Sequence, residues 1–162
     1  MNLPRRVRPQ SLQTLTPFFA PKSIAVIGAS RHPGKIGHIV IKNLIQGGYR
    51  GKIIPVNPNA EEILGLPSHR LLVEAETPVD LAIVVVPAAA VLSALNDCAR
   101  CGVKAVIVLA AGFREIGPKG AKREAKAAAF CREHNIRLLG PNCLGLIDTA
   151  ANLNASFARQ RP

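Results

Sequence analysis

The sequence predicts an α/β protein built on a doubly wound parallel β-sheet with helices on both faces. Short runs rich in Val, Ile, Leu and Ala recur along the chain, as expected for strands that are buried on both sides. Amphipathic segments of helical length separate these runs, and glycines stand where the helices would end. Alternating strands and helices with short connections build a parallel sheet.

Five segments are predicted to be strands and four to be helices. The apolar runs place strands at residues 23–28, 52–57, 80–86, 104–109 and 136–139. Helices are predicted at residues 36–46, 61–64, 88–101 and 120–133. Gly47 and Gly48 end the first helix and Gly102 ends the third, because a left-handed C-cap favours glycine. The last helix is rich in Ala, Lys, Arg and Glu, which indicates a solvent-facing helix.

The chain is expected to form one domain with short flanks. Its 162 residues and 48% hydrophobic content suffice for one core. We expect residues 1–16 to be a basic flexible tail, 17–150 the ligand-binding domain, and 151–162 the start of a linker to a downstream domain outside this chain. No apolar run approaches the roughly 18–20 residues of a membrane span, and no apolar core of a secretory signal follows the basic start. We therefore expect a cytoplasmic protein without a membrane partner.

The net charge of +11 comes from 21 Lys and Arg against 10 Asp and Glu. Such an excess can indicate nucleic acid, anionic lipid or an anionic small ligand as the partner. The basic residues are scattered, and aromatic residues make up only 4% of the chain, which leaves little for base stacking. We therefore expect no nucleic-acid partner. An acidic neighbouring domain or subunit is the alternative explanation of the charge.

The strongest functional signal is the stretch 24–37. An apolar run ends at Gly28, and the small residues Ala29 and Ser30 form a turn before a helical segment begins. A strand, a tight turn and a helix N-terminus present backbone N–H groups and the helix dipole to a phosphate. Lys35 stands at the helix start, where its ammonium can add a charge-assisted contact. The stretch therefore predicts a phosphate-binding loop in a Rossmann-like fold.

This loop departs from the G-x-G-x-x-G fingerprint of nicotinamide and flavin sites. The second and third glycines of that pattern are replaced by Ser30 and Pro33, and the next glycines are Gly34 and Gly37. After the second strand, enzymes that use NAD usually place a carboxylate for the ribose 2′-hydroxyl, but this chain has Asn57. The pattern favours a phosphate-bearing nucleotide of another class, whose 3′-phosphate would meet no repulsion at this position.

The carboxyl ends of the other strands should complete the site, because ligands of open α/β sheets bind at that edge. Unusual residues follow each strand there: Val56-Asn57-Pro58, Val86-Pro87, Ala110-Ala111-Gly112 and Pro141-Asn142-Cys143. Asn142 could bond amide groups of an extended ligand or cap the following turn.

The cysteines and histidines predict neither a metal site nor a catalytic residue. Cys98 and Cys101 have C-x-x-C spacing, but no second pair completes a zinc site, so buried small residues are the favoured interpretation. Cys143 could be a nucleophile, but no neighbour that would activate its thiol is identifiable, so we expect it to line the pocket. The histidines show no metal spacing: His32, His38, His69 and His134.

Several motifs in fixed order resemble the amino-terminal CoA-binding domain of NDP-forming acyl-CoA synthetases, which include the ADP-forming acetate–CoA ligases. The resemblance covers roughly residues 17–158 and rests on segments 23–30, 33–37, 54–58, 79–87, 110–113, 139–145 and 153–157. More distantly, the chain resembles the α-subunit of succinyl-CoA synthetase. The same module opens the bacterial protein lysine acetyltransferases.

The resemblance implies coenzyme A or acyl-CoA as the ligand and assigns residues to each part of it. The phosphates would be held by Gly28, Ala29, Ser30 and Lys35. The adenine–ribose side would be lined by Val56, Asn57 and Pro58, with Val86 and Pro87 beside them. The pantetheine arm would be followed by Ala111, Gly112 and Asn142.

In that family, a phosphorylated histidine lies in the next domain and an ATP-grasp domain supplies the nucleotide chemistry. No histidine of this chain matches that position. We therefore expect part of an acid–thiol ligase, inactive by itself, whose partners are those domains in cis or in a partner subunit. The alternatives are a stand-alone CoA-binding regulatory module and, third, an NAD(P)-dependent oxidoreductase.

Overall fold

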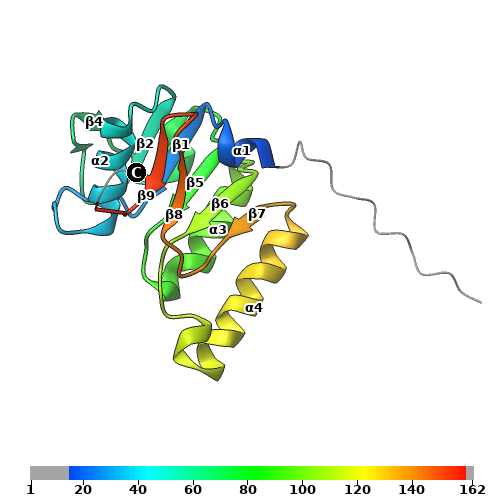
Figure 1. The fold of residues 1–162 in the computed structure, drawn as a ribbon. Helices are drawn as coiled ribbons and strands as arrows, with labels where there is room; N and C mark the ends of the chain where they lie inside the picture. Colours follow the sequence, from blue (N-terminus) through cyan, green and yellow to red (C-terminus); the bar gives the residue numbers. More distant parts are fainter. Residues whose placement is uncertain (1–14, 160–162) are drawn as a thin grey trace, which may run out of the picture.

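The computed structural model describes residues 15–159, in which five parallel strands form a central sheet (Figure 1). The strand order is β2-β1-β5-β6-β7, and every neighbouring pair is parallel. The bounds are β1 Ser23–Ile27, β2 Lys52–Val56, β5 Leu81–Val84, β6 Ala105–Val108 and β7 Arg137–Leu139. These are the five strands that the apolar runs predict. The α/β class and the Rossmann-like sheet are thereby confirmed.

Helices cover both faces of the sheet, which explains the continuous apolar runs. On one face, α3 (Val91–Arg100) and α4 (Pro118–Glu133) pack against strand residues such as Ala25. On the other face, α2 (Ile36–Gly47) and the short α1 (Thr16–Phe19) pack against strand residues such as Val26. Because successive residues of a strand point to opposite faces, a strand covered on both sides needs apolar residues throughout.

Three of the four predicted helices are confirmed. The segments predicted at 36–46 and 120–133 are α2 and α4, and the segment predicted at 88–101 begins as the 3-10 turn η3 (Ala88–Ala90) and continues as α3. Two further 3-10 turns, η2 (Leu72–Ala75) and η4 (Arg114–Ile116), lie in the connections before β5 and before α4.

The helix predicted at residues 61–64 is wrong, because this segment forms a small antiparallel hairpin. Its strands are β3 (Glu62–Ile63) and β4 (Leu66–Pro67). The two residues between them, Leu64 and Gly65, have φ angles of 53° and 78°. Positive φ at both central residues is the signature of a type I′ turn, which matches the twist of a two-residue hairpin. A helix would need negative φ at both positions.

A second hairpin, formed by β8 (Gly145–Asp148) and β9 (Leu153–Ser156), was not predicted. Its strand β9 is fully buried, and Leu153 and Ala155 share a core cluster with α2. The expected domain boundary at residue 150 falls within this hairpin, and the division of the chain into domains stays a prediction. Residues 1–14 of the expected tail and residues 160–162 lie outside the described residues.

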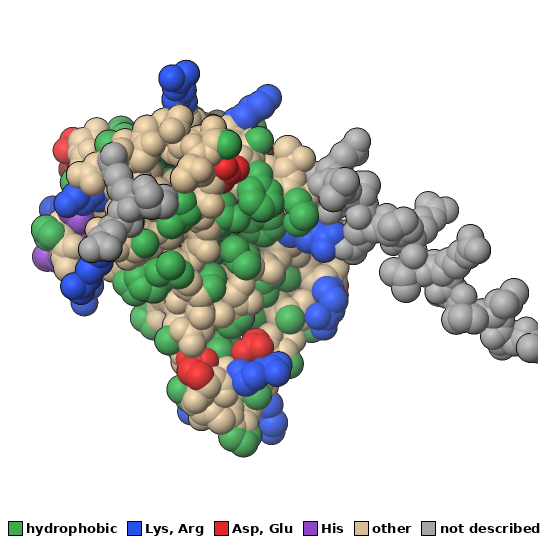
Figure 2. Space-filling view, in the orientation of Figure 1, with side chains coloured by type: hydrophobic (Ala, Val, Ile, Leu, Met, Phe, Trp, Pro, Cys, Tyr) green, Lys and Arg blue, Asp and Glu red, His purple; other side chains and the backbone are tan. Residues whose placement is uncertain are grey.

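The surface in Figure 2 carries its Lys and Arg side chains around the rim, while hydrophobic side chains gather near the centre. On this face the positive charge therefore forms no continuous basic patch. Within residues 15–159, no helix combines the length and the hydrophobicity needed to cross a bilayer.

Asn43 adds a hydrogen-bonded link between α2 and the end of β9 to the apolar packing between them. Its side-chain amide donates hydrogen bonds to the carbonyls of Ser156 and Ala158, each at 2.9 Å. Removing a partner of a buried or part-buried hydrogen bond costs about 1–3 kcal/mol. Asn43→Ala should therefore lower the free energy of unfolding in urea by that amount, whereas Lys42→Ala, an exposed neighbour on α2, should change it little. Equal stabilities of the two variants would contradict this role.

Candidate functional site

A hollow of about 430 Å³ lies at the carboxyl ends of β1, β2 and β5. The chain leaves β1 toward β2 on one side and places β5 on the other, so this is the topological switch point where such sheets bind ligands. Most of the predicted site residues line it: Gly28, Ala29, Ser30, Lys35, Asn57, Pro58, Val86 and Pro87. Ile36 and Gly37, which belong to the predicted phosphate-binding stretch, also line the hollow, as do Asn59 and Val85, to which the sequence assigned no role.

The first turn of α2 supplies backbone donors that face a ligand, whereas the first two residues of the turn before it do not. The N–H groups of Gly28 and Ala29 donate to the carbonyl of Val56, at 3.0 and 3.2 Å, and are therefore occupied. Val56 itself is buried beneath the turn. The first N–H groups of a helix have no intrahelical acceptor.

In the first turn of α2, the N–H groups of His38 and Ile39 donate back to Lys35, which leaves those of Ile36 and Gly37 as the donors at the hollow. No side chain caps this end of α2. An anion in the hollow would satisfy these donors and interact favourably with the helix dipole.

Gly37 sets how closely α2 approaches the end of β1. A Cβ atom built on Gly37 would lie 2.1 Å from the carbonyl oxygen of Gly28, a separation that real structures do not allow. A Cβ on Gly34 would have no neighbour within 4 Å. Of the two glycines beside Lys35, only Gly37 is therefore required by packing, and it takes the part that the last glycine of a dinucleotide fingerprint plays.

Asn57 joins the two loops that border the hollow. Its side-chain amide donates to the carbonyl of Ala29 at 2.6 Å, and its side-chain oxygen accepts from the N–H of Asn59 at 2.7 Å. Across the same gap, the Arg31 guanidinium donates to the carbonyl of Asn59 at 3.4 Å. The side-chain polar atoms of Asn57 thus position the two loops. The residue can therefore contact a ligand mainly by van der Waals packing.

The charge at the hollow is positive. Lys35 lines it, and no carboxylate does so among the residues that the structure describes. A cation at a helix N-terminus opposes the helix dipole, which favours negative charge there. Lys35 therefore stands where a bound anion would remove an unfavourable interaction and add a charge-assisted contact.

The loop after β6 is held by charged side chains. The N–H groups of Gly112 and Phe113 both donate to the Glu115 carboxylate, the second at 3.1 Å, and Arg123 donates to the carbonyl of Gly112. These N–H groups, that of Gly112 first, lower the pKa of Glu115 because they stabilise its ionised form.

Ala111, Gly112 and Asn142 lie after β6 and β7, at the same edge of the sheet, but they do not line the hollow. The N–H of Asn142 donates to the carbonyl of Ala110 at 3.0 Å, which ties these two loops together. Their place along a pantetheine arm remains a prediction.

The thiols lie in surroundings that suppress reactivity. Burial raises the pKa of Cys143, whose Sγ lies 3.5 Å from the carbonyl oxygen of Val108. Burial also raises the pKa of Cys98 to about 12 and that of Cys131 to about 11. Protonated thiols are poor nucleophiles and poor metal ligands. Within the described part of the chain, no three His, Cys, Asp or Glu side chains gather as a metal site would require.

Comparison with known proteins matches residues 22–149 to a family model described as a CoA binding domain. The chain is 42% identical over 142 residues to an ADP-forming acetate–CoA ligase of Methanocaldococcus jannaschii. It is 44% identical over 148 residues to the alpha subunit of ADP-forming acetate–CoA ligase I of Pyrococcus furiosus. These matches cover 88% and 89% of this chain but 20% and 32% of the relatives. The chain thus spans between a fifth and a third of the curated relatives it matches.

Solved structures agree with the sequence comparison. A dinucleotide forming acetyl-coenzyme A synthetase of Candidatus Korarchaeum cryptofilum, in complex with phosphate and ADP, matches with a TM-score of 0.85 and 38% identity over 88% of this chain and 30% of its own. A conserved hypothetical protein of Pyrococcus furiosus matches with a TM-score of 0.60 and 30% identity over 75% of this chain and 94% of its own.

The two glycines beside Lys35 form a matched pair for a stability test. Gly37→Ala forces a Cβ against the backbone of β1, and overpacking of this kind costs about 1–3 kcal/mol. Gly34→Ala meets no neighbour and should be neutral or slightly stabilising. Thermal unfolding of both variants provides the measurement, and equal melting temperatures would contradict the packing role of Gly37.

The carboxylate of Glu115 should make stability depend on pH. Because its pKa is lower in the folded than in the unfolded state, it contributes stability above the unfolded-state pKa, and this contribution is lost as pH falls through the folded-state pKa. Glu115→Gln should therefore be less stable than the natural chain at neutral pH, and the difference should shrink on acidification. Denaturant unfolding of both chains from neutral to acidic pH measures this difference in stability. A difference that stays constant with pH would exclude the N–H contacts to Glu115.

Proposed function

The chain belongs to the CoA-binding domain family, and on that premise we propose that the hollow at the β1–α2 turn receives the phosphates of coenzyme A or of an acyl-CoA. One observation carries this proposal. Lys35 and the N–H groups of Ile36 and Gly37 stand together at the hollow, and among the described residues no carboxylate lines it. Donors and positive charge without a competing anion are what a phosphate requires.

The rest of the ligand would extend along the same edge of the sheet. The adenine–ribose side would lie against Pro58, Val86 and Pro87, whose side chains offer apolar surface at the hollow. The pantetheine arm would then run toward Ala111, Gly112 and Asn142, after β6 and β7. The supporting observation is that β1, β2, β5, β6 and β7 are parallel neighbours, so their carboxyl ends form one continuous edge.

A dinucleotide role is less well supported by the same geometry. A ribose 2′-hydroxyl is usually bound by an acidic side chain after the second strand. The residue at that position, Asn57, has its amide engaged with Ala29 and Asn59.

We further propose that this chain presents the CoA thiol or thioester to chemistry performed elsewhere. The chain spans only part of its ADP-forming ligase relatives, one of which is itself a subunit. The partners would be ATP-grasp and phosphohistidine domains, in the same polypeptide or in a partner subunit, and the location would be the cytoplasm. Acyl-CoA formation from acid, CoA and ATP, assayed with this chain alone and with a candidate ATP-grasp subunit, tests the proposal. Turnover by this chain alone would overturn it.

A stand-alone CoA-binding module is the second candidate. The match to a Pyrococcus furiosus protein over 94% of that protein's chain favours it, because that chain is little more than this domain. The same assay separates the two candidates. A stand-alone module should bind CoA and yield no acyl-CoA with any candidate partner.

The contribution of Lys35 to CoA binding is directly testable. Loss of a charge-assisted hydrogen bond costs about 1–3 kcal/mol, so Lys35→Ala should weaken CoA about 5- to 150-fold in a calorimetric titration. Lys42→Ala, which removes an exposed charge elsewhere on α2, is the matched control and should bind CoA nearly as the natural chain does. An unchanged affinity in Lys35→Ala would remove Lys35 from the site.

A further inference from the structure

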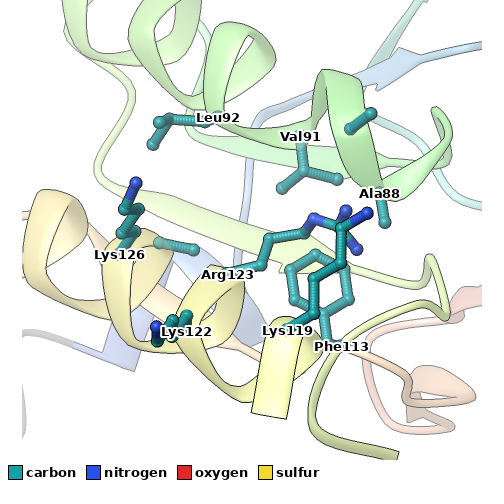
Figure 3. A pocket seen from close by; sticks show the side chains of 10 residues that line it. Ala88, Val91, Leu92, Phe113, Lys119, Lys122, Arg123 and Lys126 are labelled. Carbon is teal, nitrogen blue, oxygen red and sulfur yellow. The ribbon is translucent and has the colours of Figure 1, made fainter. Parts of the chain in front are cut away.

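A second hollow, of about 360 Å³, lies between the amino-terminal parts of α3 and α4 (Figure 3). Its α4 side carries only basic side chains among its charged groups: Lys119, Lys122, Arg123 and Lys126. Apolar residues of η3, α3 and the β6–α4 loop line the rest, among them Val91 and Phe113. In Figure 3, the side chains of Lys119, Arg123 and Lys126 extend from α4 toward α3. The hollow shares no lining residue with the β1–α2 hollow.

The basic side chains repel one another along one face of α4. Lys119 and Lys122 stand at i and i+3 along the helix. Lys122 and Lys126 stand at i and i+4, as do Lys119 and Arg123. Like charges at these spacings are neighbours on a helix and destabilise it. Without a counter-charge, this face of α4 is electrostatically unfavourable.

The nearby carboxylates are engaged elsewhere. Glu124 forms an ion pair with Arg114 at 3.2 Å and also accepts from the Arg114 N–H. Glu115 accepts from the backbone of Gly112 and Phe113. Within residues 15–159, none of the three lysines of the hollow has a carboxylate partner.

Arg123 is held in place before any ligand arrives. Its guanidinium donates to the carbonyl of Gly112 and lies over the Phe113 ring at 5.9 Å from the centroid. The Phe113 ring is fully buried, so it forms a fixed floor beneath the guanidinium. A guanidinium offers five N–H donors, and the contact with Gly112 uses one of its terminal nitrogens. The remaining donors form a preorganised fork of the kind that suits phosphate.

We propose that the α3–α4 hollow binds a small molecule that carries two or more phosphate groups. Its volume lies within the range of small-molecule pockets, and its accessible apolar side chains, those of Ala88, Ala89 and Leu92, can receive the non-phosphate part of such a ligand. Several flexible ammonium groups around one fixed guanidinium can neutralise a polyphosphate, whereas one monoanion would leave most of the charge uncompensated. A concave hollow favours a compact anion over a flat acidic protein surface, which would meet the lysine tips but not the Arg123 guanidinium held inside.

Inorganic tripolyphosphate is the probe. Its binding is measured from the chemical shifts of the backbone amides in NMR spectra of the full chain at physiological ionic strength. We expect shifts clustered at residues 88–92, 113 and 119–127. The triple variant Lys119→Ala, Lys122→Ala, Lys126→Ala should weaken binding at least about tenfold, because three charge-assisted contacts are lost. The control, Lys42→Ala, Lys52→Ala, Lys104→Ala, removes the same charge elsewhere and should weaken it less than about threefold, as screened long-range charges do.

The outcomes separate this site from the proposed CoA site. Lys35→Ala should leave the shifts at the α3–α4 hollow unchanged. Shifts confined to residues 28–37, or an equal loss of affinity in both triple variants, would overturn the proposal without touching CoA binding. A hexaglutamate peptide that binds the same residues more tightly than tripolyphosphate would also overturn it and would identify an acidic protein segment as the occupant.

Discussion

The close packing of α2 against the end of β1 is the constraint on which the candidate site depends. Only a residue without a Cβ can stand at Gly37, because the carbonyl of Gly28 occupies the space. This approach brings the first N–H groups of α2 over the β1–α2 turn, in which the N–H groups of Gly28 and Ala29 are engaged with Val56. The capacity to hold an anion therefore depends on where α2 begins. Gly28 contributes by allowing the backbone to turn at the end of β1.

The sheet was predictable because burial on both faces leaves a simple signature in the sequence. The hairpins were not, for two different reasons. In the first, Gly65 is a turn signal, but the other turn residue is Leu64, which adopts a positive φ that leucine rarely takes, so the two-residue turn could not be recognised from the sequence. In the second, the buried strand β9 contains Asn154 and Ser156, whose polar side chains conceal its burial. The Ser156 hydroxyl donates to the Asn154 side-chain oxygen at 2.6 Å, which makes burial of this pair tolerable.

The location of the candidate site was predictable from the sequence, but the hydrogen bonds made by its individual residues were not. The strand ends and the turn at Gly28 correctly indicated the position of the hollow. The sequence alone does not distinguish Gly34 from Gly37. The position of α2 against the end of β1 shows that packing requires only Gly37. The engagement of the Asn57 amide likewise depends on the distance between two loops far apart in the sequence. The pantetheine side rests on the family resemblance and remains a prediction.

We propose that the first turn of α2 holds the phosphates of coenzyme A, and the other assignments along the ligand follow from this. A crystal structure of the chain with bound CoA tests this most directly. We expect pyrophosphate oxygens within hydrogen-bond distance of the N–H groups of Ile36 and Gly37, with the Lys35 ammonium beside them and the hydrogen bond from the Gly28 N–H to the Val56 carbonyl unbroken. Phosphates bound away from this turn, in the α3–α4 hollow or elsewhere on the surface, would contradict it.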